Sequence, residues 1–202
     1  MQLYLASASA RRHQILNELN IKHQVLHVPS PEGEDEPILP GEHPKEYAKR
    51  TAHEKLQRAL QWLGEKQSKT AAVLCADTCV AIDNSILGKP ENNAQAAEFL
   101  QTLSNRSHWV FTAQALSFNG EIYQSLSSNE VVFRKLSPAE IKAYCATNEP
   151  FGKAGGYGIQ GQASFFIKAL RGRYSAVMGL DIYDLYQLLK QAGLHQLCFK
   201  ST

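Results

Sequence analysis

One aspartate in the sequence stands where a charged side chain is costly. Asp77 directly follows the apolar run 71–76, which predicts a buried strand that ends there, and it precedes Thr78. A carboxylate at the end of a buried strand costs several kcal/mol unless it is paired or bound to a metal. Proteins keep such groups most often at functional sites. Asp77 is therefore the candidate catalytic residue, and an aspartate that only caps a turn is the alternative.

The N-terminal segment has the composition of an anion-binding turn. A short predicted strand, 3–6, leads into small residues, with Ser9 as the candidate N-cap of the next helix. The N–H groups and the dipole at a helix start favour a bound anion. Arg11 and Arg12 add guanidinium groups, which bind phosphate oxygens in pairs. Ser7, Ser9 and Arg12 are thus candidate phosphate ligands, and an ordinary capped helix with surface arginines is the alternative.

Three lysines could complete a polyphosphate site. Lys55 lies in a helix predicted to run from Pro44 to about residue 66. Lys89 lies in a rigid turn before Pro90, and Lys153 begins a glycine-rich segment. Each lysine alone is typical of a solvated surface charge. If the fold brings them into one cleft with the arginines, they form a cradle for a polyphosphate.

The glycine-rich segment is 152–161. Its glycines permit unusual backbone angles and a close approach to a ligand, although their spacing is not that of a P-loop. Gln160 carries both a hydrogen-bond donor and an acceptor, as recognition of a base edge requires. A loop without fixed structure is the alternative, but the side chains of Tyr157 and Ile159 favour order.

An acidic cluster with Glu32 and Glu36 lies within the proline-rich loop predicted for 29–44. Beside a phosphate ligand, one or two carboxylates of such a cluster can hold Mg²⁺. We therefore expect a divalent cation, Mg²⁺ or Mn²⁺, with Asp77 and Glu32 as its candidate ligands. A solvated acidic loop is the alternative. The histidines show no metal-ligand spacing, and neither an HExxH nor a GxSxG motif is present in the sequence.

The composition is that of an ordinary globular protein. The chain has 202 residues, 44% of them hydrophobic, which predicts one domain over 1–202. Its 21 basic and 19 acidic residues give a net charge of +2, too small to indicate a nucleic-acid polymer or an anionic membrane as partner. No apolar run approaches the roughly 18 residues of a membrane helix. The four cysteines fit no disulfide-rich module and no signal peptide is evident, so we expect a cytoplasmic protein.

Strands and helices are predicted to alternate irregularly along the chain. Asn119-Gly120 is a strong hairpin signal, 137–140 reads as a capping box, and Ile182 and Leu185 are expected to face inward. Hairpins together with αβ units predict an α/β fold in which helices flank a mixed sheet. The predicted strands are 3–6, 71–76, 80–82, 86–87, 109–118, 122–133 and 165–167. One predicted helix begins after Ser9, and four more cover 44–66, 94–103, 138–146 and 182–192.

In their order along the chain, these segments resemble the Maf family of nucleoside triphosphate pyrophosphatases, from about residue 3 to 189. Any one segment would be a weak signal, whereas the ordered set is specific. The matching pieces are LASASARR at 5–12, AHEK at 52–55, ADT at 76–78, GKP at 88–90, His108 with Thr112, KAGGYGIQG at 153–161 and VMGL at 177–180.

The resemblance implies a curved mixed sheet with a deep cleft between two lobes, often in a homodimer. It implies hydrolysis of a nucleoside triphosphate to the monophosphate and pyrophosphate with a divalent cation. It places the catalytic base on Asp77 and substrate specificity on Arg11, Thr78 and Gln160. The ADT and YGIQG motifs are similar to those of the branch that acts on dTTP and UTP, which would make the chain a house-cleaning enzyme of the nucleotide pool, with modified pyrimidine nucleotides as further substrates.

Two other functions stay open. One is an inosine or xanthosine triphosphate pyrophosphatase, and the other is a nucleotide-binding regulator of cell division with little turnover. The carboxylate of Asp77 favours an enzyme, because a sensor of a polyanion gains nothing from a buried negative charge.

The sequence departs from the family's usual pattern at four positions. Ala10 and Asp181 stand where proline is usual. Asn105 stands where glycine is common, and asparagine can adopt the same left-handed conformation as glycine. Gly152 stands where this branch usually has aspartate. If that aspartate helps to bind the metal, the acidic loop or Asp77 must compensate for its absence.

Overall fold

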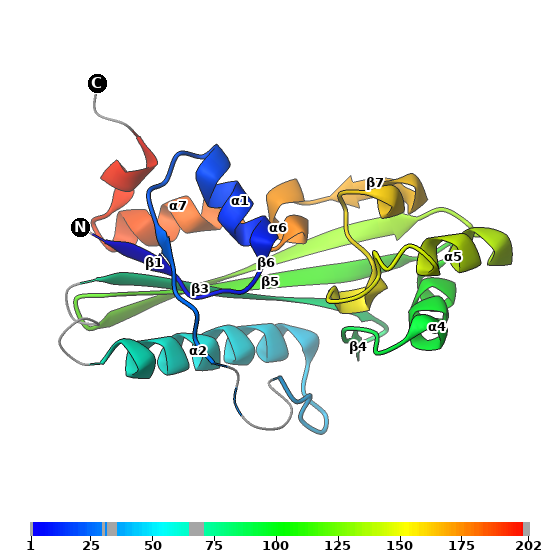
Figure 1. Cartoon of the computed structure of the whole chain (residues 1–202), viewed down its shortest axis with the longest axis horizontal. Coiled ribbons are helices and arrows are strands. Elements are labelled where there is room, and N and C mark those ends of the chain that lie inside the picture. Colours follow the sequence, from blue (N-terminus) through cyan, green and yellow to red (C-terminus); the bar gives the residue numbers. More distant parts are fainter. Residues whose placement is uncertain (1, 30, 32–35, 65–70, 200–202) are drawn as a thin grey trace.

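The centre of the molecule is a seven-stranded mixed sheet with helices on both faces (Figure 1). The computed structural model describes residues 2–29, 31, 36–64 and 71–199. The strand order is β2-β1-β3-β5-β6-β7, and β4 pairs with β3. β1 runs parallel to β2 and β3, whereas the pairs from β3 to β7 are antiparallel. The predicted α/β fold with a mixed sheet is confirmed. The strands are β1 (Leu3–Leu5), β2 (Gln24–Val25), β3 (Ala72–Ile82), β4 (Ser85–Leu87), β5 (Ser107–Phe118), β6 (Glu121–Phe133) and β7 (Ile167–Arg171).

The two faces of the sheet carry different helices. Side chains alternate along a strand, so Val73 and Cys75 of β3 pack against Leu56 of α2 on one face. Leu74 and Ala76 point to the other face and join an apolar core with α1 and α7. A second core joins the far end of β3 to α4 and α5. The helices are α1 (Ala10–Glu18), α2 (Pro44–Leu63), α4 (Asn93–Leu103), α5 (Pro138–Cys145), α6 (Tyr174–Met178), α7 (Ile182–Gln191) and the 3₁₀ turns η1 (Ala154–Gly156), η2 (Gln162–Phe166) and η3 (His195–Cys198).

Several turns and caps form where the sequence predicts them. Asn119 and Gly120 both have positive φ, 53° and 83°, in the turn that joins β5 and β6. The capping box of 137–140 is complete at the start of α5. Asn105 follows α4 in the left-handed conformation, with φ of 59°. None of the helices in the described part of the chain is long and apolar enough to cross a membrane.

The prediction that a strand ends at residue 76 is wrong. β3 continues through Asp77 as one strand of 11 residues and pairs with β5 from Val73 to Ala81. The residues after Asp77 are β-branched or apolar, and they pair as regularly as the residues before it. Asp77 therefore lies in the middle of a central strand.

Two further predictions are wrong near the C-terminus. Phe165 and Phe166 belong to η2, and strand β7 begins only at Ile167, because Phe165 has no buried face and is 75% exposed. Ile182 is exposed and does not face inward. It is the first residue of α7, whose buried side is formed by Leu185 and the leucines that follow it.

One edge of β3 is open at its middle. β1 pairs with β3 over 72–74, whereas β4 pairs with it over 80–82. Between these two neighbours, 75–79 have no strand partner on that side within the described chain. Asp77 and Thr78 point to opposite faces of the sheet, so the open edge lets both side chains border the same space.

Candidate active site

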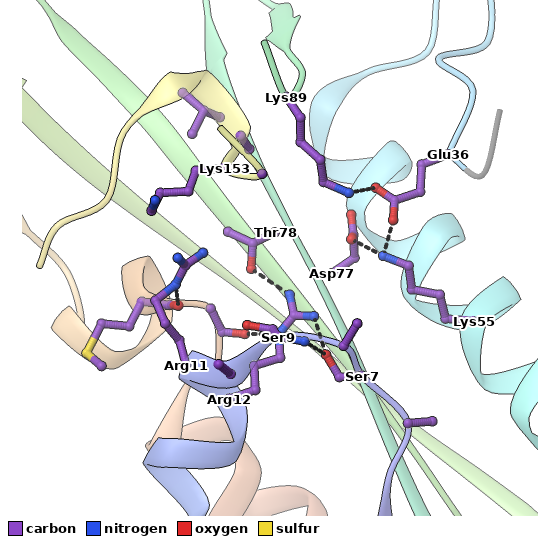
Figure 2. Close-up of a pocket in the computed structure, with 18 of the residues that line it drawn as sticks. Ser7, Ser9, Arg11, Arg12, Glu36, Lys55, Asp77, Thr78, Lys89 and Lys153 are labelled. Carbon is purple, nitrogen blue, oxygen red and sulfur yellow. Dashed lines mark hydrogen bonds and ion pairs between the residues drawn. The ribbon is translucent and has the colours of Figure 1, made fainter. Parts of the chain in front are cut away.

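A cavity of about 580 Å³ lies at the open edge of β3 (Figure 2). Its walls come from the turn before α1, the middle of β3, the start of the glycine-rich segment and the end of α6. Gln160 is not among its lining residues, and Glu32 lies outside the described residues. The predicted site residues that line the cavity are Ser7, Ser9, Arg11, Arg12, Lys55, Asp77, Thr78, Lys89 and Lys153.

Asp77 is held from helix α2. The Thr51 hydroxyl donates to its Oδ2 at 2.7 Å, and Lys55 Nζ donates to its Oδ1 at 2.6 Å. Burial alone would raise the pKa of this carboxyl. The charges of Lys55 and Arg12, with the hydrogen bonds from Lys55 and Thr51, outweigh burial and hold the pKa of Asp77 below its ordinary value. Asp77 is therefore ionised at neutral pH, as a base or a metal ligand must be.

A second carboxylate reaches the same lysine. Glu36 forms an ion pair with Lys55, and its other oxygen lies 3.5 Å from Nζ of Lys89. The predicted acidic cluster includes Glu36, but the prediction named Glu32 as its metal ligand; that Glu36 lies nearest to α2 along the chain was the available signal for it. We call Asp77, Glu36, Lys55 and Lys89 the paired pole of the cavity, because its two ammonium groups contact two carboxylates (Figure 2).

Arg12 joins three segments at the centre of the site. Its buried guanidinium donates to the carbonyl of Gly179 at 2.7 Å. It also donates to the hydroxyls of Ser7 and Thr78, at 3.1 and 3.3 Å. The Thr78 hydroxyl in turn lies 3.0 Å from that of Thr112. A guanidinium has five N–H groups, so two of those on Arg12 remain for a ligand.

The turn before α1 borders the cavity with small side chains. Ser9 is the N-cap residue of α1, as predicted, but its side chain makes no capping hydrogen bond. Its backbone N–H instead donates to the Ser7 hydroxyl at 3.2 Å. Ser7, Ser9 and Ala10 all line the cavity, so the start of α1 faces the space where a ligand would lie.

Two cations occupy the other side of the cavity. Arg11 extends from α1 and Lys153 from the glycine-rich segment, and Figure 2 shows both pointing into the same space, away from the paired pole. Arg11 Nε donates to the carbonyl of Met178 at 3.3 Å, and Lys153 Nζ donates to the carbonyl of Glu149. Among the described residues, neither cation forms an ion pair with a carboxylate. We call Arg11 and Lys153 the basic pole.

The glycine-rich segment is ordered, as predicted, and approaches β3 closely. Gly155 has φ of 67°, and a Cβ added to it would lie 2.8 Å from a methyl carbon of Val80. Gly158 lies against the stem of Lys153, where a Cβ would come within 3.2 Å of two side-chain carbons. The contact at Gly155, together with its positive φ, requires glycine, whereas a side chain at Gly158 would press on the flexible stem of Lys153.

A buried histidine anchors the segment to the sheet. His108 Nε2 lies 2.6 Å from the hydroxyl of Tyr157, which lines the cavity. Burial lowers the pKa of His108 to about 4, so the ring is neutral at pH 7. Its Nδ1 has no hydrogen-bond partner among the described residues. This pair holds the glycine-rich segment over β5.

Comparison with known proteins identifies the family of this chain. The family model described as Maf-like protein matches residues 2–192. The chain belongs to the Maf family. A dTTP/UTP pyrophosphatase of Bordetella pertussis is 46% identical and covers 96% of this chain and 93% of its own. Proteins of the same name from Nitrosomonas europaea and Neisseria gonorrhoeae are 42% and 40% identical, covering 95% of this chain and 95% and 94% of their own. A solved dITP/XTP pyrophosphatase of Mycobacterium abscessus aligns over 96% of each chain at 15% identity, with a TM-score of 0.41.

The departures from the usual Maf pattern now have places in the fold. Asp181 is fully buried, caps α7 and forms an ion pair with Arg173 at 2.5 Å, so it has a structural role. Gly152 lines the cavity next to Lys153 with φ of 70°, and a Cβ there would meet no heavy atom within 4 Å. The change at 152 therefore alters the charge of the cavity and leaves its packing intact.

Asp77 and Glu36 are the carboxylates available to a divalent cation. Mg²⁺ usually binds proteins through one or two carboxylates together with substrate phosphates. Within the described part of the chain, no group of three or more histidine, cysteine, aspartate or glutamate side chains is arranged to hold a metal. Asp77 and Glu36, which both contact Lys55, supply the two carboxylates that such a substrate-completed site needs.

Proposed function

We propose that this chain hydrolyses dTTP and UTP to the nucleoside monophosphates and pyrophosphate. The activity for which its relatives are named supports pyrimidine substrates over inosine or xanthosine triphosphate. The observation that carries the proposal is an ionised carboxylate, Asp77, in one cavity with Arg11, Arg12 and three lysines. Phosphoryl transfer needs this combination, because a triphosphate repels a nucleophile until its charge is neutralised.

The proposed reaction is attack of water on the α-phosphorus. A new P–O bond forms, the bond from that phosphorus to the oxygen bridging to the β-phosphate breaks, and pyrophosphate leaves. Asp77 accepts a hydrogen bond from the water, orients it and takes its proton. Because its pKa is low, Asp77 is deprotonated at neutral pH but is a weak base. Its main contribution is therefore the position of the water, while Arg12, Lys55 and Lys89 position the triphosphate.

We also propose that Mg²⁺ or Mn²⁺ binds between Asp77 and Glu36, with phosphate oxygens as its other ligands. Glu36 here takes the role that the sequence predicted for Glu32. The cation, when bound, neutralises phosphate charge and polarises the phosphoryl oxygens. Lys55 contacts one oxygen of each carboxylate, so both carboxylates lie at the same part of the cavity.

Substrate specificity is proposed to depend on Thr78, Arg11 and Gln160, the positions that the resemblance implies, with direct recognition of the base edge at Thr78. The Thr78 hydroxyl lies in the middle of the cavity wall, where it can meet a base edge. Gln160 follows Ile159, which does line the cavity, so its influence on the base would act through the position of the segment.

The cellular setting is also proposed. The cysteines are free thiols, three of them buried, which supports a reducing compartment such as the cytoplasm. There the activity would remove excess or modified nucleotides from the precursor pool. A homodimer is expected from the resemblance. Light scattering tests it, with a mass of twice 22.5 kDa as the expected result.

The test of the proposed function is product analysis with a panel of nucleotides. Purified protein is incubated with dTTP, UTP, CTP, ATP, GTP, ITP and XTP in the presence of Mg²⁺ or Mn²⁺. We expect pyrophosphate release, fastest with dTTP and UTP. Release of inorganic phosphate instead would exclude α–β cleavage. A preference for ITP and XTP would support the inosine or xanthosine triphosphate alternative, and tight binding without turnover would support the regulatory alternative.

A further inference from the structure

The cations of the cavity differ in how much of their charge is available to a ligand. Lys55 and Lys89 contact Asp77 and Glu36, so the formal charge of the paired pole is zero. Arg11 and Lys153 donate to backbone carbonyls and, among the described residues, form no ion pair; the charge of Glu149 acts on Lys153 from a distance, so the basic pole keeps a net positive charge. A polyanion is therefore attracted more strongly to the basic pole than to the paired pole.

The two basic side chains are directed and partly dehydrated. Each donates one N–H group to a carbonyl, which fixes its direction and leaves its other N–H groups available. Burial lowers the pKa of both; for Lys153 the charge of Arg11 lowers the pKa further, and the charge of Glu149 raises it in part. Two neighbouring, half-buried cations that repel each other are stabilised by a bound anion.

The position of the basic pole suits the leaving group. In phosphoryl transfer the attacking and leaving oxygens lie roughly in line across the phosphorus. Asp77, which orients the water, belongs to the paired pole, and Arg11 and Lys153 lie across the cavity from it (Figure 2). The group that departs from the α-phosphorus is thus directed toward the basic pole.

We propose that Arg11 and Lys153 form a subsite for the β- and γ-phosphates, which binds the leaving pyrophosphate and retains it as product. This inference rests on the proposed α–β cleavage. Pyrophosphate carries more charge than the α-phosphate, whereas a pyrimidine base is neutral and gains little from two cations. Arg11 accordingly contacts the leaving group, and its effect on base preference, implied by the resemblance, is indirect.

The test is direct binding of inorganic pyrophosphate and of dTMP, measured by titration calorimetry without turnover. Lys153→Gln and Arg11→Gln are each expected to raise the Kd for pyrophosphate about 10-fold or more, since hydrogen bonds to charged groups are among the strongest. The Kd for dTMP should change less than about twofold. Product inhibition by pyrophosphate should weaken in parallel, and Lys153→Arg should restore part of the affinity.

The matched control is Lys142→Gln, an exposed lysine on α5, which should change neither Kd. Circular dichroism and thermal unfolding check that each variant folds. A loss of dTMP affinity with unchanged pyrophosphate affinity would place Arg11 and Lys153 on the nucleoside and overturn the proposal. Unchanged affinity for both ligands would overturn it as well. If the wild-type protein releases inorganic phosphate, the proposed function fails, but the binding comparison still tests the subsite.

Discussion

The paired pole and the basic pole of the cavity contain similar cations with different functions. At the paired pole, carboxylates both direct Lys55 and Lys89 and cancel their charge. At the basic pole, carbonyls direct Arg11 and Lys153, and neither cation forms an ion pair with a described carboxylate. The first arrangement is suited to hold a carboxylate ionised, and the second to attract an anion. The acceptor that a cation contacts, more than the number of cations, therefore decides what a phosphate site does.

Removal of the carboxylate should have the largest effect. Asp77→Asn keeps the shape of the side chain but loses its charge and its ability to take a proton. We expect kcat to fall about 10³-fold, because a positioned base contributes 10²–10⁴-fold. The measurement is the initial rate of pyrophosphate release. Asp83→Asn, at an exposed ion pair with Arg106, is the control and should keep the wild-type rate. Full activity in Asp77→Asn would remove this residue from the mechanism.

Loss of the lysine at the paired pole should come next. In Lys55→Gln the two carboxylates lose their shared cation, and we expect kcat/KM to fall about 10²-fold. The pH profile should change as well. The pKa of Asp77 lies below its ordinary value in the wild-type protein, so activity and stability from its charge are present above about pH 4 and are lost as pH falls through the lowered pKa.

Without Lys55 that pKa rises, so the acid limb of kcat/KM should move to higher pH. Lys49→Gln, an exposed lysine of the same helix that pairs with Glu46, is the control and should leave the limb in place. An unmoved limb in Lys55→Gln would mean that another group sets the charge of Asp77.

A new carboxylate at position 152 should make the basic pole resemble the paired pole. Gly152→Asp places a carboxylate next to Lys153, in open space and at a positive φ that aspartate tolerates. We expect the Kd for pyrophosphate to rise about threefold, the size of a partly exposed charge interaction. Gly152→Asn has the same shape without the charge and should bind as the wild type does. Tighter metal binding and faster turnover in Gly152→Asp would instead indicate a metal ligand at this position.

The smallest effect on turnover should come from the anchor of the glycine-rich segment. Tyr157→Phe removes the hydroxyl that meets His108 and leaves a buried ring nitrogen without a partner. We expect the free energy of unfolding to fall by about 1–3 kcal/mol and kcat/KM to fall only about twofold. Urea unfolding and steady-state rates measure the two effects, with the exposed Tyr174→Phe as control. A larger loss of rate than of stability would show that Tyr157 acts on the substrate.

The sequence carries the local features well and the long-range ones poorly. Asn119-Gly120, the capping box of α5 and the order of the glycine-rich segment follow from local chemistry, and the structure contains all three. That Asp77 is unusual also follows from its apolar neighbours. The position of Asp77 in the middle of β3 cannot be predicted from those neighbours, because the strand continues only through its pairing with β5. Tertiary pairing here overrides the break that a charged residue suggests.

The partners of the site residues could not be predicted for the same reason. Glu36 reaches Lys55 through a loop whose path no periodic pattern encodes. Lys89 and Lys153 look alike in sequence, yet one contacts a carboxylate and the other a carbonyl. These differences depend on distances between segments far apart in the chain, which spacing and residue type do not determine.

The alternation of side chains on β3 makes strand register a condition for catalysis. A slip of one residue against β5 would exchange Asp77 and Thr78 between the faces of the sheet, taking the carboxylate from Lys55 and the hydroxyl from Arg12. The ladder from Val73–Ser117 to Ala81–Trp109 prevents that slip. Apolar residues of β3 and β5 that do not contact the nucleotide thus determine on which face of the sheet the site side chains lie.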